Sequence, residues 1–181
     1  MLLFNSEKSL MNKIAMGDAN ACRTFVDEYM PMVYRVAIQT VNDNTKAEDI
    51  TQEVFIKVWE KAESFKGDYK LKTWLYRITV NTSIDLLRKH KVSCDIDNFE
   101  FADDTDLSDT TIFKQQSSKQ IKQVIEKLKP MERTVITLFY WEELKIKEIA
   151  KVMDITTSAV DSMLRRARVK IGKDLNMEEL V

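Results

Sequence analysis

Apolar residues recur three or four positions apart along most of the chain, which is the spacing that one buried face of an α-helix produces. In residues 25–37 these positions are Phe25, Tyr29, Met32, Val33, Val36 and Ala37. In residues 47–62 they are Ala47, Ile50, Val54, Val58 and Ala62. Further helices are expected from about residue 71 to 90 and from Pro130 onward, since proline suits a first helical position. The pattern predicts an all-α protein.

Local signals place the expected helix ends. Gly17-Asp18 reads as a helix stop followed by an N-cap. Pro31 falls inside an apolar pattern, so a helix break is expected there. Thr45-Lys-Ala-Glu48 fits a capping box at the start of a long helix. Residues 64–68 are expected to form a loop.

The composition supports helices and divides the chain. Only three glycines and two prolines occur among 181 residues, which leaves little material for hairpin turns. Net charge is −1, but residues 92–113 contain no Lys or Arg and show no clear period. Seven acids lie there: Asp95, Asp97, Glu100, Asp103, Asp104, Asp106 and Asp109. We therefore expect two small helical modules, residues 1–91 and 119–181, joined by a flexible acidic linker over residues 92–118.

Several classes of protein are excluded by what the chain lacks. No apolar run approaches the ~20 residues that span a bilayer, and the first residues do not form a signal peptide, so a cytoplasmic protein is expected. Cys22 and Cys94 lack metal-ligand spacing and are interpreted as free thiols. One histidine, His90, and no phosphate-binding loop argue against an enzyme, a cofactor or a metal. The paired acids Glu142-Glu143 are interpreted as solvated.

The strongest local motif runs from residue 146 to 168, where the spacing matches a helix-turn-helix. Its apolar framework is Ala150, Ile155, Val160 and Met163. Asp154 occupies the turn, where a residue that tolerates a left-handed backbone is needed, and Thr156 can cap the second helix. Base edges would face Thr157, Ser158, Asp161 and Ser162. Phosphates would contact the basic cluster Arg165, Arg166, Arg168, Lys170 and Lys173. The alternative is an ordinary helical hairpin with a solvated basic face, but the full spacing favours duplex binding.

Residues 61–91 combine basic charge with aromatic rings. Eight Lys or Arg residues oppose three acids, a balance of +5. Interleaved with them are Phe65, Tyr69, Trp74 and Tyr76. Cations that follow a backbone and rings that stack on bases are the chemistry of single-strand binding. The alternative is a basic helix with core aromatics, and for Trp74 alone that alternative is favoured.

These segments together resemble a known family. Residues 47–55 (AEDITQEVF), 64–68 (SFKGD) and 71–81 (LKTWLYRITVN) are similar to region 2 of sigma factors of the extracytoplasmic-function (ECF) subfamily of the sigma-70 family. Residues 128–133 (LKPMER) and the segment from 147 to 168 are similar to its region 4. The resemblance covers nearly all of the chain outside the linker.

The resemblance implies a non-enzymatic protein that binds core RNA polymerase, reads the −35 element as duplex with region 4, and captures the melted −10 element with region 2. It also implies an anti-sigma factor, often membrane-bound, as a partner. The expected polymerase-binding residues form one helix stripe, Asp49, Gln52, Glu53 and Ile56. The expected −10 residues are Phe65, Lys66, Gly67, Asp68, Arg77 and Asn81. The expected −35 residues are Thr157, Ser158, Asp161, Ser162, Arg165, Arg166 and Arg168.

Two departures from the family pattern affect the expected DNA contacts. Asp161 and Met163 stand where many relatives carry Lys or Arg; Asp161 could accept from a cytosine amino group or pair with Arg165. Arg77-Ile78 stand where housekeeping sigma factors have paired tryptophans. A competing interpretation is a stand-alone operator-binding regulator with the same helix-turn-helix, which leaves the first 90 residues unexplained. DNA binding without polymerase would distinguish it.

Overall fold

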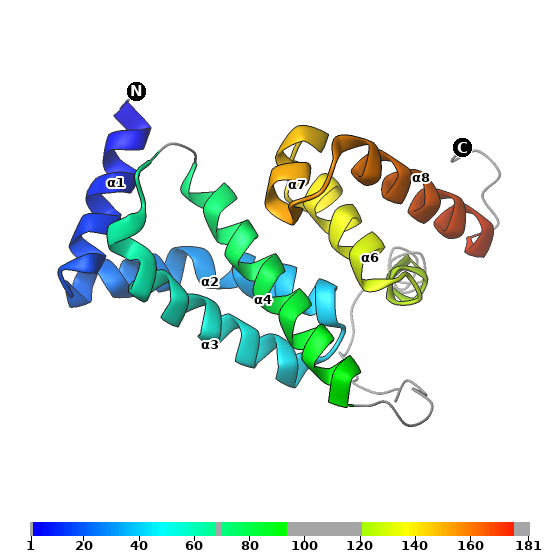
Figure 1. Cartoon of the computed structure of the whole chain (residues 1–181), viewed down its shortest axis with the longest axis horizontal. Coiled ribbons are helices and arrows are strands. Elements are labelled where there is room, and N and C mark those ends of the chain that lie inside the picture. The colour runs from blue at the N-terminus through cyan, green and yellow to red at the C-terminus, as the bar shows by residue number, and fades with distance from the viewer. Residues whose placement is uncertain (1, 68–69, 94–120, 176–181) are drawn as a thin grey trace, which may run out of the picture.

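The computed structural model describes residues 2–67, 70–93 and 121–175, and within them every regular element is helical (Figure 1). The elements are α1 Leu2–Ala15, α2 Ala19–Val41, α3 Asn44–Lys61, the short 3-10 helix η1 Ala62–Ser64, α4 Leu71–Ser93, α6 Pro130–Ile136, the π-helical turn η2 Thr137–Trp141, α7 Ile146–Met153 and α8 Thr157–Asp174. Residues 121–126 are also helical. The all-α prediction is confirmed. The predicted linker lies outside the described residues, except that its first two residues end α4.

The first predicted helix boundary is confirmed. Gly17 has a φ of +77°, and Asp18 caps α2 by accepting from the backbone N–H groups of Asn20 and Ala21. The other two predicted boundaries are wrong. α2 continues through Pro31, because Tyr29, Met32 and Val33 on either side are buried and their packing offsets the lost backbone hydrogen bond.

The N-cap of α3 is Asp43 rather than Thr45. Asn42 ends α2 in a left-handed conformation with a φ of +55°, so only Asn42 and Asp43 separate the two helices. The carboxylate of Asp43 is then the side chain in position to accept from the backbone N–H of Lys46.

α2, α3 and α4 form the core of the first module, and α1 packs across η1 and the start of α2 (Figure 1). The predicted apolar stripe of α3 is confirmed, since Ile50, Val54 and Val58 are fully buried. The Phe25 ring meets Phe55 edge-on with centroids 5.9 Å apart. This core fixes α3 and α4 side by side, so residues on both helices can contribute to one surface.

The second module is the predicted helix-turn-helix. α7 ends at Met153, and Asp154 adopts the left-handed conformation with a φ of +55° that the turn requires. Thr156 then caps α8 by accepting from the backbone N–H of Ala159. Val160 is fully buried between the helices. The motif predicted from spacing is therefore confirmed.

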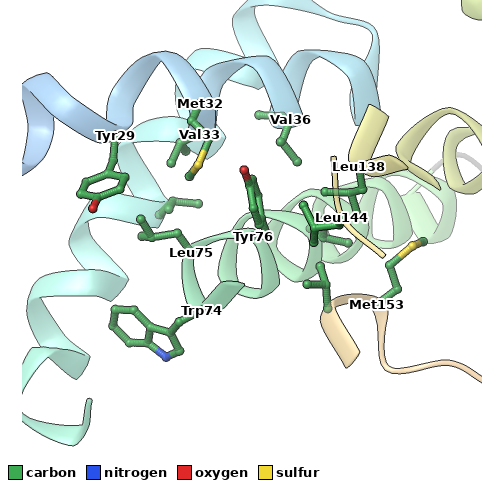
Figure 2. Close-up of a cluster of buried hydrophobic side chains, with 14 of the residues drawn as sticks. Tyr29, Met32, Val33, Val36, Trp74, Leu75, Tyr76, Leu138, Leu144 and Met153 are labelled. Carbon is green, nitrogen blue, oxygen red and sulfur yellow. The ribbon is translucent and has the colours of Figure 1, made fainter. Parts of the chain in front are cut away.

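The two modules are packed against each other and share one core. α7 lies on α4 and α6 lies on α2. Figure 2 shows Leu138 and Leu144 of the second module close to Val36 of α2 and Tyr76 of α4. The expectation of two modules joined by the linker alone is thus incomplete, because each module carries an apolar face that the other covers. None of the described helices is long and apolar enough to cross a membrane.

Candidate polymerase and nucleic-acid interfaces

The predicted polymerase-binding stripe lies on the solvent side of α3. Asp49, Gln52 and Glu53 are exposed, and Ile56 is 51% exposed, opposite the buried stripe of the same helix. Trp59, one turn after Ile56, is 40% exposed and was missed in the sequence analysis. Its i+3 spacing from Ile56 was the available signal. The stripe therefore combines acids with an apolar end, and exposed apolar side chains of this kind can act as anchors in a protein interface.

A cavity of about 350 Å³ lies between α3 and α4. It is lined by Lys57, Lys61, Trp74, Arg77, Ile78, Asn81, Thr82 and Asp85. Of the six predicted −10 residues, the cavity brings together Arg77 and Asn81. The cations from α3 were not predicted, because only the packing of α3 on α4 places them beside Arg77.

The remaining predicted −10 residues take other places. Phe65 is 4% exposed, and its ring centroid lies 5.4 Å from that of Trp74, so Phe65 supports the cavity wall from behind. Trp74 is 8% exposed, which confirms its interpretation as a core aromatic. Lys66 is exposed and Gly67 has a φ of +77°. Asp68 lies outside the described residues.

Lys57 connects the docking stripe with the cavity. Its Nζ lies 2.7 Å from Oε1 of Glu53 and donates to Oγ1 of Thr82 at 3.0 Å. Glu53 belongs to the docking stripe, and Thr82 lines the cavity. One cation is thus shared between the docking stripe of α3 and the cavity.

The first turns of α8 present the predicted base-reading residues. Thr157, Ser158, Asp161 and Arg165 are exposed and Ser162 is half-buried. Among the described residues no ion pair or hydrogen bond joins Asp161 to Arg165.

Three members of the basic cluster are engaged within the second module. Lys170 Nζ lies 2.6 Å from Oε2 of Glu132, and Arg166 Nε lies 3.5 Å from Oε1 of the same carboxylate. Burial raises the pKa of Glu132, but the hydrogen bond and charge of Lys170, with smaller contributions from Lys129 and Arg166, bring the net pKa below its ordinary value.

Arg168 has a different neighbourhood from Arg166. Its guanidinium carbon lies 5.5 Å from the ring centroid of Phe139 and 5.7 Å from that of Tyr140. Its Nε also donates to the Tyr140 hydroxyl at 2.9 Å. A guanidinium held over two rings is fixed in direction, so Arg168 is oriented before any ligand arrives.

Two family models and several relatives match this chain. Sigma-70 region 2 matches residues 25–92, and sigma-70 region 4 matches residues 118–171. The ECF RNA polymerase sigma factor SigW of Bacillus subtilis is 31% identical over 179 residues, covering 93% of this chain and 96% of the relative. The chain belongs to the ECF sigma factors of the sigma-70 family. The resemblance noted in the sequence is confirmed.

Other comparisons agree with this assignment. The RNA polymerase sigma-H factor of Pseudomonas aeruginosa is 29% identical over 97% of this sigma factor and 96% of its own length. The sigma factor RpoE of Bartonella quintana, solved in complex with the anti-sigma factor NepR, shares the fold with a TM-score of 0.69 and 22% identity, covering 87% of this chain and 98% of that chain. Sigma factors bind core RNA polymerase and promoter DNA and are not enzymes. The alternative of a stand-alone operator-binding regulator is not favoured.

Proposed function

We propose that this sigma factor divides promoter recognition among three surfaces. The α3 stripe binds core RNA polymerase, the cavity between α3 and α4 holds an unstacked base of the melted −10 element, and the first turns of α8 read the −35 duplex. The observation that supports this best is the cavity, because it places Arg77 and Asn81 beside Trp74 and two lysines.

The cavity has the chemistry that a flipped base requires. Its volume lies in the range of small-ligand pockets. Asn81 and Thr82 can hydrogen-bond to a base edge, and Trp74 and Ile78 supply an apolar wall. Arg77 provides a cation for the phosphate on either side of that base. Asn81 and Arg77 are both exposed at the cavity, so a single strand can reach them.

The α3 stripe suits a basic or amphipathic surface on the polymerase. Asp49 and Glu53 provide negative charge that guides association, and Ile56 with Trp59 provides the apolar area that desolvates on binding. Both kinds of contact are available at once, since the four side chains are exposed on one helix.

The proposed −35 surface contains residues that contact base edges and residues that contact phosphates. Thr157, Ser158 and Asp161 lie at the exposed start of α8, the part of a recognition helix that enters the major groove. Arg165 is exposed one turn later and can contact a guanine or a phosphate. Arg166 contributes less to DNA affinity than its charge implies, because Glu132 already pairs with it.

The proposed function implies where the protein acts and which partner regulates it. It acts in the bacterial cytoplasm, where core RNA polymerase works. An anti-sigma factor is its expected regulator, since a solved relative was captured with one. Neither partner is a small-molecule substrate, and no cofactor is required.

Run-off transcription with purified core polymerase tests the proposal. The wild-type protein should give a promoter-dependent transcript, and Asn81→Ala should reduce it at least tenfold while holoenzyme still forms. Permanganate footprinting should show reduced melting at the −10 element. Arg23→Ala, at an exposed position on α2, is the control and should transcribe normally. A transcript unchanged in Asn81→Ala would contradict the cavity assignment, and tight operator binding without polymerase would contradict the sigma function.

A further inference from the structure

Glu132 is a buried acid beside the exposed face of α8. It lies in the first turn of α6, where α6 packs against α8 (Figure 1), and it is 4% exposed. Its Oε2 also accepts from the backbone N–H of Lys129 at 3.4 Å. Burial alone would raise the pKa of Glu132, but the hydrogen bond and charge of Lys170 bring it below the ordinary value, so the carboxylate is ionised at neutral pH. A fixed negative charge therefore lies next to the helix proposed to bind the −35 duplex.

Two cations of α8 contact this carboxylate. Lys170 Nζ lies 2.6 Å from Oε2 of Glu132, and Arg166 Nε lies 3.5 Å from Oε1. The two positions are four residues apart, on the flank of α8 that faces α6. The Lys170 side chain is 44% exposed and that of Arg166 is 55% exposed, so a DNA phosphate can reach both. Each carboxylate oxygen thus pairs with a cation that DNA could otherwise use.

Arg168 and Arg165 provide the comparison within the same helix. The neighbours of Arg168 are the rings of Phe139 and Tyr140 and the Tyr140 hydroxyl, none of which is an acid. These contacts orient the guanidinium and leave its positive charge uncompensated. Arg165 is exposed, and within the described part of the chain it forms no ion pair. The cations of α8 are therefore of two kinds, those paired with an acid and those available to phosphates.

A phosphate can recruit Lys170 only at the expense of Glu132. A buried carboxylate that loses its partner is strongly destabilising, because Glu132 stays buried in α6 and cannot reach water. A lysine–phosphate contact at the surface gains less, since water and salt screen it. The pair with Glu132 is therefore retained when DNA is present, and the same carboxylate repels the phosphates nearest to it.

We propose that Glu132 limits the sequence-independent affinity of this sigma factor for duplex DNA by withholding Lys170 and Arg166 from the phosphate backbone. The inference rests on the proposed function, because it takes α8 to be the duplex-binding helix. Phosphate contacts fix the position of a protein on DNA but read no sequence. Non-specific sites vastly outnumber promoters, so each additional phosphate contact would hold the free protein on bulk DNA. With two cations withheld, binding relies on the base contacts of α8 and on the polymerase scaffold.

The salt dependence of duplex binding tests the proposal in the full chain. The logarithm of the association constant falls with the logarithm of salt concentration, with a slope of about −0.9 for each neutralised phosphate. Fluorescence anisotropy with a labelled duplex of unrelated sequence, at a series of sodium chloride concentrations, measures this slope. Glu132→Gln should steepen the slope by about 0.9 to 1.8 and raise the affinity at low salt by about tenfold for each released cation. An unchanged slope in folded Glu132→Gln would overturn the proposal.

A matched control separates the ion pair from net charge. Glu143→Gln removes the same charge from an exposed position of the second module, and its slope should equal that of wild type. An equal gain in Glu143→Gln would show that only net charge matters and would overturn the proposal. Adding Lys170→Met to Glu132→Gln should remove about half of the gained slope, because one of the two released cations is lost. Full retention of the gain would contradict the role of Lys170.

A second duplex separates phosphate contacts from base reading. It carries the −35 element of a promoter that the holoenzyme transcribes. Glu132→Gln should gain affinity equally for this duplex and for the unrelated one, because the released cations contact phosphates in both. A gain confined to the −35 duplex would assign Glu132 to base reading and overturn the proposal.

Two further variants protect the test against loss of folding. If circular dichroism shows that Glu132→Gln loses helix, Arg165→Met and Lys170→Met in the otherwise unchanged chain decide the question. Arg165→Met should remove a whole contact, about 0.9 of the slope, and Lys170→Met less than half of that. Equal losses in the two variants would overturn the proposal. An unchanged slope in Arg165→Met would instead contradict the duplex-binding role of α8, whereas a normal loss in Arg165→Met without a gain in Glu132→Gln would contradict this inference alone.

Discussion

At the scale of single residues, the buried carboxylate of Glu132 holds two cations of the second module in place. Glu132 is 4% exposed in α6 and pairs with Lys170 and Arg166 of α8. Both cations lie on the helix proposed to bind the −35 element. The same carboxylate therefore stabilises the second module and limits the charge that α8 offers to phosphates.

Replacing Glu132 by Gln should lower the stability of the fold, and the loss should depend on pH. The folded pKa of Glu132 lies below its ordinary value of 4.5, so its charge stabilises the fold above pH 4.5, and that stabilisation is lost as pH falls through the folded pKa. We expect Glu132→Gln to lower the free energy of unfolding by about 2 kcal/mol at neutral pH, with the difference shrinking well below pH 4.5. Urea unfolding at neutral pH and at a pH well below 4.5 measures this difference in the free energy of unfolding. A constant difference would show that packing rather than charge matters here, and Glu143→Gln is the exposed control.

Asp161 is an acid on a helix that otherwise carries a basic cluster. It is exposed at the start of α8, and it makes no ion pair with Arg165 among the described contacts. A carboxylate near phosphates lowers affinity, and we propose that Asp161 instead accepts from a cytosine amino group.

Asp161→Ala should therefore relax the −35 preference at one or two base pairs. Each wrong base there should cost less than the usual ~1–3 kcal/mol. Transcription from a library randomised over the −35 element measures the preference, with Arg166→Ala as the comparison that should affect all sequences alike. An unchanged preference in Asp161→Ala would show that the residue only faces solvent.

At the scale of elements, α3 serves three purposes on three faces. Ile50, Val54 and Val58 face the core, Asp49 and Glu53 face solvent, and the C-terminal turns contribute Lys57 and Lys61 to the cavity. The surfaces proposed for docking on polymerase and for capture of the −10 strand therefore lie on adjacent faces of one helix.

Charge reversal at Asp49 and Glu53 should separate docking from folding. We expect the affinity for core polymerase to fall at least about tenfold, which corresponds to about 1.4 kcal/mol. The free energy of unfolding should change by less than about 0.5 kcal/mol, because both side chains are exposed. Competition against wild type for core polymerase, with Asp27→Lys on α2 as control, measures the affinity for core polymerase. Normal competition by the double variant would place the docking surface elsewhere.

At the scale of the whole molecule, affinity for a promoter depends on how far apart the two modules are held. Each module carries a small DNA-binding surface, and their affinities combine only when a scaffold sets the spacing between them. In the structure the two modules are packed against each other, since α7 lies on α4. Core polymerase is expected to supply the spacing that a promoter requires.

The free protein should accordingly bind promoter duplex weakly, and the addition of core polymerase should give promoter-specific binding. Fluorescence anisotropy with labelled promoter DNA, at physiological salt and with a scrambled duplex as control, measures both states. Tight, sequence-specific binding by the free protein would contradict the requirement for a scaffold.

The sequence by itself determined the features that depend on neighbouring residues. Helix content, the α1–α2 boundary at Gly17 and Asp18, and the turn of the helix-turn-helix at Asp154 each follow from residues within one or two helical turns. The exposed stripe of α3 follows from its period. Two local expectations, at Pro31 and Thr45, were wrong because packing outweighed the first and a better-placed cap replaced the second.

Only the tertiary structure decided which of these residues meet. Glu142, expected to be solvated, is buried because Arg35 lies 107 positions earlier in the chain and folds beside it. Lys57 belongs to the cavity because α3 packs on α4. Arg168 lies over the Phe139 ring because the fold brings this part of α8 beside η2. Local sequence sets the periodicity and the ends of a helix, but burial and ion pairing depend on the surface that covers it, and that surface comes from distant parts of the chain.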